Sequence, residues 1–91
     1  MITWDEKKCQ TNRKQHGIDF ADCASIFDGA TVSNEDFRES YGEMRICSLG
    51  LLKESVVMAV WTPRFDSGIH LISVRKATKN ETKRFWKTVR Y

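Results

Sequence analysis

The stretch Ile69-His70-Leu71-Ile72-Ser73-Val74-Arg75-Lys76-Ala77-Thr78-Lys79-Asn80-Glu81 carries the most informative pattern in this 91-residue chain. It begins with alternating apolar residues, the pattern of a strand with one buried face. It ends in a Thr-x-x-Glu capping box, in which each side chain accepts a hydrogen bond from a free backbone N–H at a helix start. The sequence therefore predicts a strand over 69–74 that leads into a C-terminal helix. Because Arg75, Lys76 and His70 lie near this junction, we expect it to be the functional end of the protein.

Two further strands are predicted upstream, over 43–50 and 56–62. The first alternates along its length, and the second is a nearly continuous run of β-forming residues, as expected for a central strand. The connections are short, with a turn at 63–68, so the three strands should form an antiparallel meander. Residues 30–34 can add a short edge strand, which gives three to four strands. The polar segment 35–42 is predicted to be a mobile loop.

Two helices are predicted before the sheet. Thr3-x-x-Glu6 repeats the capping-box pattern, so the first helix is expected to begin at Trp4 and to end at Gly17. Asp19 can cap a second helix, whose apolar residues follow the i, i+3, i+4, i+7 spacing. The predicted fold class is α+β, as one domain over residues 1–91, with two N-terminal helices, a small antiparallel sheet and a basic C-terminal helix. All three helices are expected to lie largely on one face of the sheet.

Composition narrows the classes of protein to consider. A hydrophobic fraction of 41% and a single proline argue against disorder. No apolar run approaches the ~20 residues needed to cross a bilayer, and the first residues lack the plan of a signal peptide, so we expect a cytoplasmic protein without a membrane partner. The three cysteines include no Cys-x-x-Cys pair. They are therefore expected to be small buried thiols, and we expect neither a metal site nor a cofactor.

Charge is unevenly distributed along the chain. The net charge is +3, yet the segment from Arg75 onward holds seven cations and one acid, so the remainder is net acidic. A basic end on such a body favours a polyanion or an acidic protein partner, and charge alone does not choose between them. The seven cations are Arg75, Lys76, Lys79, Lys83, Arg84, Lys87 and Arg90.

The sequence shows neither a nucleotide-binding glycine loop nor a recognisable nucleophile–histidine–acid set. The chemically suggestive residues are mostly cationic: Arg45, Arg64, His70, Arg75 and Lys76, with Glu43 near them in sequence. Such a set suits RNA cleavage without a metal, because the nucleophile is the substrate's own ribose 2′-OH and the protein supplies charge and proton transfer. Each residue also has a structural interpretation: a surface ion pair, a half-buried sheet histidine, or a solvated helix face.

Three motifs of the chain resemble those of the BrnT toxin family. In chain order they are Trp4-Asp5-x-x-Lys8-x-x-x-Asn12-x-x-Gln15-His16-Gly17-Ile18-x-Phe20, Gly42-Glu43-x-Arg45-x-x-x-x-Gly50, and Ile69-x-x-Ile72-Ser73-x-Arg75-Lys76-Ala77-Thr78-x-x-Glu81. The third is the most specific, and together they span nearly the whole chain in the family's order.

This resemblance implies a RelE-like, metal-independent endoribonuclease of a type II toxin–antitoxin module, which inhibits translation and growth. The implied substrate is mRNA, either free or on the ribosome. The implied partner is a BrnA-like antitoxin, which also binds operator DNA and builds a heterotetramer. The catalytic candidates are Arg45, His70, Arg75 and Glu43. The RNA-binding candidates are Arg64, Lys76, Lys79 and Lys83.

Three positions depart from the family pattern: Gln15 replaces a lysine, His70 replaces an arginine, and Phe85 replaces a tyrosine. At the second position an imidazole is a better proton donor than a guanidinium, but a fixed charge is lost. A second hypothesis is therefore a catalytically weakened homologue that acts as an antitoxin-binding module in operon autoregulation. A plain nucleic-acid binder ranks last, because the basic run contains few exposed-looking aromatic residues besides Trp86. The antitoxin either covers the basic site or binds the polar face of the first helix.

Overall fold

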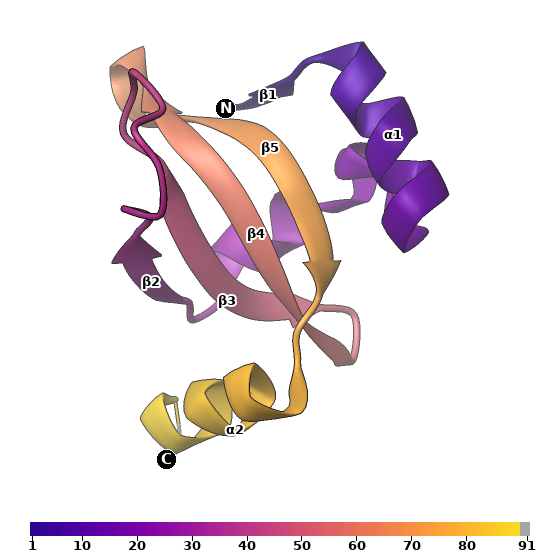
Figure 1. The fold of residues 1–91 in the computed structure, drawn as a ribbon. Helices are drawn as coiled ribbons and strands as arrows, with labels where there is room; N and C mark the ends of the chain where they lie inside the picture. The colour runs from indigo at the N-terminus through magenta and orange to yellow at the C-terminus, as the bar shows by residue number, and fades with distance from the viewer. Residues whose placement is uncertain (90–91) are drawn as a thin grey trace.

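The computed structural model describes residues 1–89 as an α+β fold with a five-stranded mixed sheet (Figure 1). Arg90, counted above among the C-terminal cations, lies outside the described residues. The strand order is β1-β5-β4-β3-β2. The strands are β1 (Ile2–Trp4), β2 (Val32–Glu35), β3 (Ile46–Leu52), β4 (Ser55–Arg64) and β5 (Gly68–Lys76). The predicted meander is confirmed as β3-β4-β5, and β2 is the expected edge strand.

The start of the chain differs from its prediction, because residues 2–4 form a strand rather than the first turn of a helix. They pair in parallel with β5, Thr3 lying opposite His70, so the sheet is mixed and not purely antiparallel. Parallel pairing satisfies the backbone of an otherwise exposed sheet edge. The helix α1 (Glu6–His16) begins two residues later than expected, and Asp5 caps it by accepting hydrogen bonds from two backbone N–H groups. Gly17 ends it as predicted, with φ at 70°.

The segment predicted as a second helix forms two short 3₁₀ turns, η1 (Phe20–Asp22) and η2 (Ala24–Asp28). Asp19 caps the first of them, as expected. The side chains that become buried are Phe20, Cys23 and Ile26, which are spaced by three residues. Three residues per turn is the period of a 3₁₀ helix, whereas the expected α-helical face would have buried Ala24, which is exposed. The prediction of two N-terminal helices is therefore wrong for the second one.

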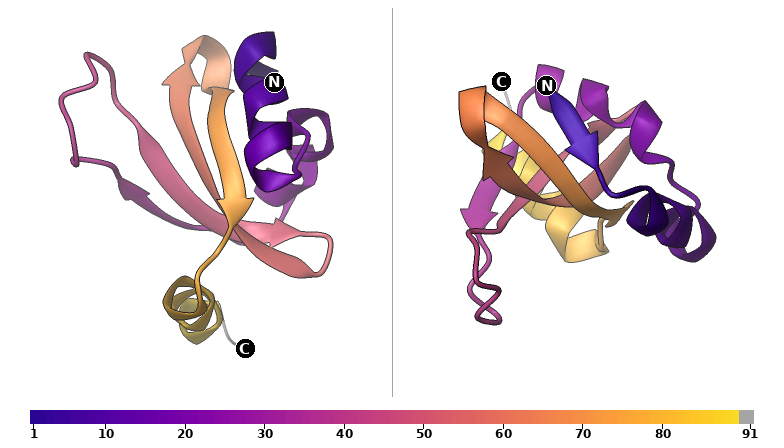
Figure 2. Two further views of the ribbon diagram at one scale, coloured as in Figure 1. Left: turned by 45° about the vertical axis from the view of Figure 1, so that its right-hand side comes forward. Right: turned by 90° about the horizontal axis from the view of Figure 1, so that it is seen from above.

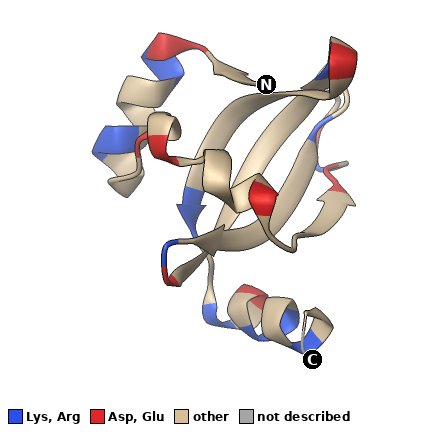
Figure 3. Cartoon of the chain, turned by 180° about the vertical axis from the view of Figure 1, so that it is seen from behind, with Lys and Arg blue, Asp and Glu red and all other residues tan. Residues whose placement is uncertain are grey.

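The 3₁₀ turns cover one face of the sheet. Ile26 and Cys23 pack there against Val57 and Ala59 of β4, and Figure 3, which views the molecule from behind, shows the turns crossing the strands. Gly50 of β3 lets η2 approach closely, because a Cβ at this position would lie 2.8 Å from a methyl carbon of Ile26. Close packing of this layer therefore depends on a residue without a side chain.

The C-terminal helix α2 (Lys79–Thr88) covers part of the opposite face, so the prediction that all helices share one face is wrong. Phe85 is 1% exposed and packs against Leu49, Val56 and Met58, which belong to a second buried cluster. This division follows from β4, in which residues 56–60 are all buried, so both of its faces need cover. The predicted capping box of α2 is confirmed. No helix within residues 1–89 is long and apolar enough to span a membrane.

The helix α1 lies beside β5 (Figure 2). Asn12 joins these two elements. The Asn12 side chain is 2% exposed. Its amide nitrogen donates to the carbonyl oxygens of Ile18 (3.0 Å) and Val74 (2.9 Å), and its oxygen accepts from the Val74 N–H (3.0 Å). The asparagine of the first motif therefore has a structural role and is not available on the surface of α1.

Candidate active site

One face of the sheet is only partly covered, and the candidate site lies on it. We use the term open face for the surface of β3–β5 that carries Cys47, Val60, Ser73 and Arg75. Figure 1 looks onto this face, with α2 below it and the connection between β2 and β3 beside it. Between these two segments lies a broad, shallow cleft with a volume of about 720 Å³. Strand residues form its floor, and charged residues from α2 and the connection line its rim.

Arg75 forms the wall of the cleft next to α2. Its guanidinium makes a two-pronged ion pair with Glu81, with nitrogen–oxygen distances of 2.8 and 3.0 Å. This pair raises the pKa of Arg75, and it lowers the pKa of Glu81 to about 2. Glu81 also accepts a hydrogen bond from the Thr78 N–H in the capping box, so the helix start fixes the arginine. The Arg75 side chain is still 37% exposed, so it can donate to a ligand in the cleft, while Glu81, which lines the cleft beside it, balances its charge.

A second charged cluster lies at the other end of the open face. Glu43 stands between two arginines, with its oxygens 3.5 Å from Arg45 Nε and 3.8 Å from an Arg64 nitrogen. The Arg45 guanidinium lies 4.0 Å from the centre of the Tyr41 ring, a cation–π contact. Arg45 Nε is buried and has no hydrogen-bond partner among the described residues. Two arginines and one carboxylate therefore leave this end with a positive charge in excess.

His70 belongs to this second cluster. Its Nδ1 lies 2.8 Å from the Thr3 hydroxyl oxygen, so the parallel strand β1, absent from our predictions, orients the ring. Partial burial lowers the pKa of His70, and the nearby Arg64 lowers this pKa further. The imidazole is therefore mostly neutral at pH 7, the form that accepts a proton.

The two clusters share one face because β5 contains a bulge. In the register, Ser73 pairs with Val60 but Leu71 pairs with Trp61, so Ile72 is the extra residue. His70 and Arg75 are five positions apart, and a regular strand would point them to opposite faces. Their partners, Thr62 and Met58, are separated by four residues of β4, or about 13 Å along the strand. The predicted catalytic residues therefore occupy two ends of one surface and do not form a single cluster.

The segment predicted to be a mobile loop contains a hydrogen-bonded network that the sequence interpretation missed. Asp36 is 8% exposed, and its carboxylate accepts from the backbone and side chain of Arg38 and from the Tyr41 hydroxyl, at 2.8 to 3.1 Å. These donors hold the pKa of Asp36 well below its usual range. The Asp36 N–H also donates to the Arg45 carbonyl oxygen (2.8 Å). The sequence signal for this network was the Asp-x-Arg pattern before Tyr41. The network joins the rim of the cleft to the Glu43 cluster, because Asp36 bonds to the backbone of Arg45.

Other residues that the sequence interpretation did not assign to the site also line the cleft. Arg84 lines it from α2 and His16 lines it from the end of α1. Cys47 lies on the floor, and burial raises the pKa of its thiol. It is therefore protonated at neutral pH and is a poor nucleophile.

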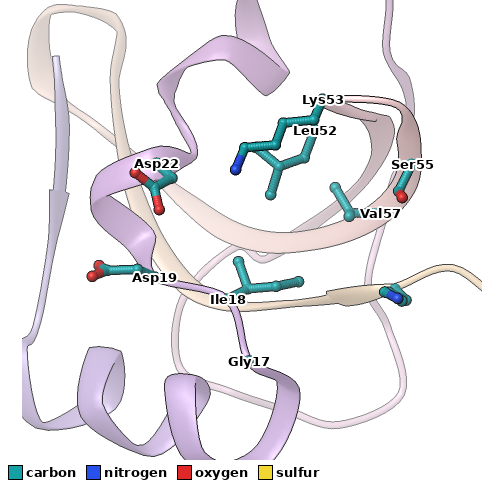
Figure 4. A pocket seen from close by; sticks show the side chains of 9 residues that line it. Gly17, Ile18, Asp19, Asp22, Leu52, Lys53, Ser55 and Val57 are labelled. Atoms are coloured by element: carbon teal, nitrogen blue, oxygen red, sulfur yellow. The ribbon is translucent and has the colours of Figure 1, made fainter.

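The predicted RNA-binding lysines lie outside the cleft. Lys76 follows Arg75 directly, so strand alternation points it to the opposite face, where it lines a separate pocket with Asp19 and Asp22 (Figure 4). Lys79 and Lys83 are exposed one turn apart on α2, and neither belongs to the buried face of the helix, which Phe85 forms. Of the four residues predicted to bind the RNA backbone, only Arg64 is close to the other candidates. Within residues 1–89, no three His, Cys, Asp or Glu side chains come together in a metal-binding arrangement.

Comparison with known proteins identifies the family. The family described as "Ribonuclease toxin, BrnT, of type II toxin-antitoxin system" matches residues 4–81, a range that includes all three motifs. Among solved structures, the ribonuclease toxin BrnT of Brucella abortus is similar, with a TM-score of 0.67 and 28% sequence identity over 86% of this chain and 96% of that chain. None of the curated protein sequences compared with the chain matches it. The chain belongs to the BrnT family of ribonuclease toxins of type II toxin–antitoxin systems.

Proposed function

We propose that this ribonuclease toxin binds RNA across the open face and cleaves it there without a metal ion. The ribose 2′ oxygen attacks the adjacent phosphorus while its proton passes to a base of the protein. The bond from phosphorus to the 5′ oxygen breaks, and that oxygen takes a proton from an acid. The products are a 2′,3′-cyclic phosphate and a 5′-hydroxyl. One observation supports the proposal above the others: a single face carries partly exposed arginines at both ends, and the His70 imidazole lies at one of these ends, oriented by Thr3.

The end with His70 has the groups that the reaction needs. A neutral imidazole can take the 2′ proton and, once protonated, give it to the departing 5′ oxygen; the Glu43 carboxylate, ion-paired with two arginines, is a second group that can accept a proton. Arg45 and Arg64 lie on either side of this carboxylate, where their charges can stabilise the dianionic phosphorane. Arg75, about 13 Å away along the sheet, holds another phosphate of the same strand. We therefore place the scissile phosphate at the His70 end and a backbone contact at Arg75.

The remaining lysines have different roles in this proposal. Lys79 and Lys83, on the outer side of α2, raise the positive potential around the cleft and speed the approach of RNA without touching the reacting atoms. Lys76 makes no contact with RNA, because it faces the other side of the sheet. This assignment separates two adjacent cations, so each serves as a control for the other.

The partner we propose is a BrnA-like antitoxin in the cytoplasm, which neutralises the toxin and carries the operator-DNA binding of the complex. The alternative role, an antitoxin-binding module with weakened catalysis, depends on the departures from the family pattern. Gln15 is exposed on α1, and Phe85 is buried in the core beneath α2, so neither lies at the reacting end. Only His70 lies on the open face among the three. The alternative therefore depends on whether an imidazole can serve there.

Expression in a bacterium without antitoxin tests the proposal. The wild type and Lys76→Ala should arrest growth, whereas Arg75→Ala should relieve the arrest, because a charge-assisted phosphate contact contributes about 1.5–3 kcal/mol. Circular dichroism and accumulation of each variant control for folding. Failure of a folded wild type to arrest growth would favour the binding module. Arrest by Arg75→Ala combined with loss of arrest in Lys76→Ala would move the site to the opposite face.

A further inference from the structure

Phe37 is an apolar side chain in an exposed and charged setting. It lies in the connection between β2 and β3, and 78% of it is exposed. It nevertheless lines the cleft, whose charged groups include the ion pairs Arg38–Asp36 and Arg75–Glu81, together with Arg84 and Glu35. Nothing in the reaction proposed above uses this ring. An exposed aromatic ring beside arginine donors, at the edge of the proposed RNA site, calls for an explanation in terms of that ligand.

The backbone around Phe37 is held in place and does not depend on the ring for its conformation. Asp36, which precedes Phe37, makes hydrogen bonds to Arg38, to Tyr41 and to the Arg45 carbonyl. These contacts fix the residues that flank the ring, while the ring itself belongs to neither buried apolar cluster. The ring is therefore presented to the cleft at a small entropy cost on binding, as in other preorganised sites.

We propose that Phe37 is a stacking platform for an unpaired base of single-stranded RNA, an inference that rests on the proposed function. Arginines that hold the backbone, combined with an aromatic ring that stacks a base, are the two components that proteins use to bind single strands. The flat ring accepts any base, so it contributes affinity and strand selection rather than sequence readout. A paired base has no free face for the ring, and Phe37 therefore selects single strands over duplexes.

A binding measurement that does not depend on cleavage tests this inference. The probe is a short single-stranded 2′-O-methyl RNA, which lacks the nucleophile, with 2-aminopurine moved along it one position at a time. Stacking on Phe37 should quench the fluorescence of the probe at one or two positions. Phe37→Leu should remove this quenching and weaken binding by about 5- to 150-fold, the range for one base–aromatic stack, whereas Phe37→Trp should retain both. The same sequence as a duplex should show neither effect.

Phe65→Leu is the matched control, because Phe65 is 97% exposed but does not line the cleft, and it should leave binding unchanged. Wild-type affinity in Phe37→Leu, or an equal loss in Phe65→Leu, would overturn the inference. Unchanged RNA binding with weakened antitoxin binding would also overturn it and assign the ring to the protein partner. The wild type could cut no RNA and yet show quenching that is lost in Phe37→Leu. That result would support stacking on Phe37 and would reject only the proposed function.

Discussion

Replacing Asn12 removes the link between α1 and β5, and the loss of stability can be worked out from its contacts. The side chain makes three buried hydrogen bonds, to Ile18 and to both backbone groups of Val74. At about 1 kcal/mol for each bond, Asn12→Ala should lower the free energy of unfolding by about 3 kcal/mol. A domain of this size has a total stability of about 5–14 kcal/mol, and the midpoint of thermal unfolding should fall by about 12–24 °C.

Asn12→Asp tests the donor part of this reasoning. Its shape is the same, but at pH 7 a carboxylate would face two carbonyl oxygens, so the loss should exceed that of the alanine variant. In acid the carboxyl group binds a proton and can donate one hydrogen bond. The gap in stability between Asn12→Asp and Asn12→Ala should therefore narrow as the pH falls from 7 to 4.

The assay is urea unfolding followed by circular dichroism, with Gln10→Ala, an exposed position of the same helix, as the control. The control should remain within about 0.5 kcal/mol of the wild type. A similarly small loss in Asn12→Ala would contradict a stabilising role for these three hydrogen bonds. Loss of ribonuclease activity in Asn12→Ala at temperatures at which the variant is fully folded would contradict a purely structural role for this residue.

Three further predictions follow from other contacts. Gly50→Ala should cost about 1–3 kcal/mol of stability in urea unfolding, because its Cβ would lie 2.8 Å from a methyl of the fully buried Ile26, whereas Gly29→Ala, with no atom within 4 Å, should be nearly neutral. Glu81→Gln should lose about 1–2 kcal/mol at pH 7, and this difference from the wild type should disappear as the pH falls from 4.5 toward 2, where the native carboxylate also binds its proton; a constant difference would contradict the ion pair. If neutral His70 takes the 2′ proton, kcat/KM should decline in acid with an apparent pKa below the ordinary 6.5, and a decline centred above 7 would exclude it as the base.

The sequence was sufficient where the signals were local. The capping box of α2 and the alternation of the three central strands predicted those elements, with boundaries displaced by only a few residues. Strand β1 was not predictable in the same way, because three residues at the start pair with a strand almost 70 positions later. The 3₁₀ turns after Asp19 were missed because apolar residues spaced by three and by four overlap in so short a segment.

The positions of some candidate site residues could likewise be predicted from the sequence, and those of others could not. Arg45, Glu43 and Arg64 come together, as expected from a meander that places the ends of neighbouring strands side by side. The position of His70 relative to Arg75 depends on a bulge, for which a single sequence gives no clear signal. Lys76 could have been separated from Arg75 in advance, since adjacent strand residues point to opposite faces.

The network around Asp36 is different again, because it depends on distant partners as well as local ones. Its carboxylate uses Arg38 and Tyr41, but its backbone is anchored on the carbonyl of Arg45, in the segment that leads into β3. The polar composition of segment 35–42 therefore suggested a mobile loop, whereas in the fold the buried Asp36 carboxylate accepts several hydrogen bonds that order the segment. The aromatic ring that this network presents to the cleft was missed for the same reason.

The most direct test of the account is incubation of the purified wild type, Arg75→Ala and Lys76→Ala with total RNA in EDTA, followed by analysis of the fragment ends. We expect fragments with 2′,3′-cyclic phosphates from the wild type and Lys76→Ala, and a large loss of product with Arg75→Ala. Intact RNA with the folded wild type that becomes fragmented when Mg²⁺ is restored, or equal cleavage by folded Arg75→Ala, would contradict this expectation.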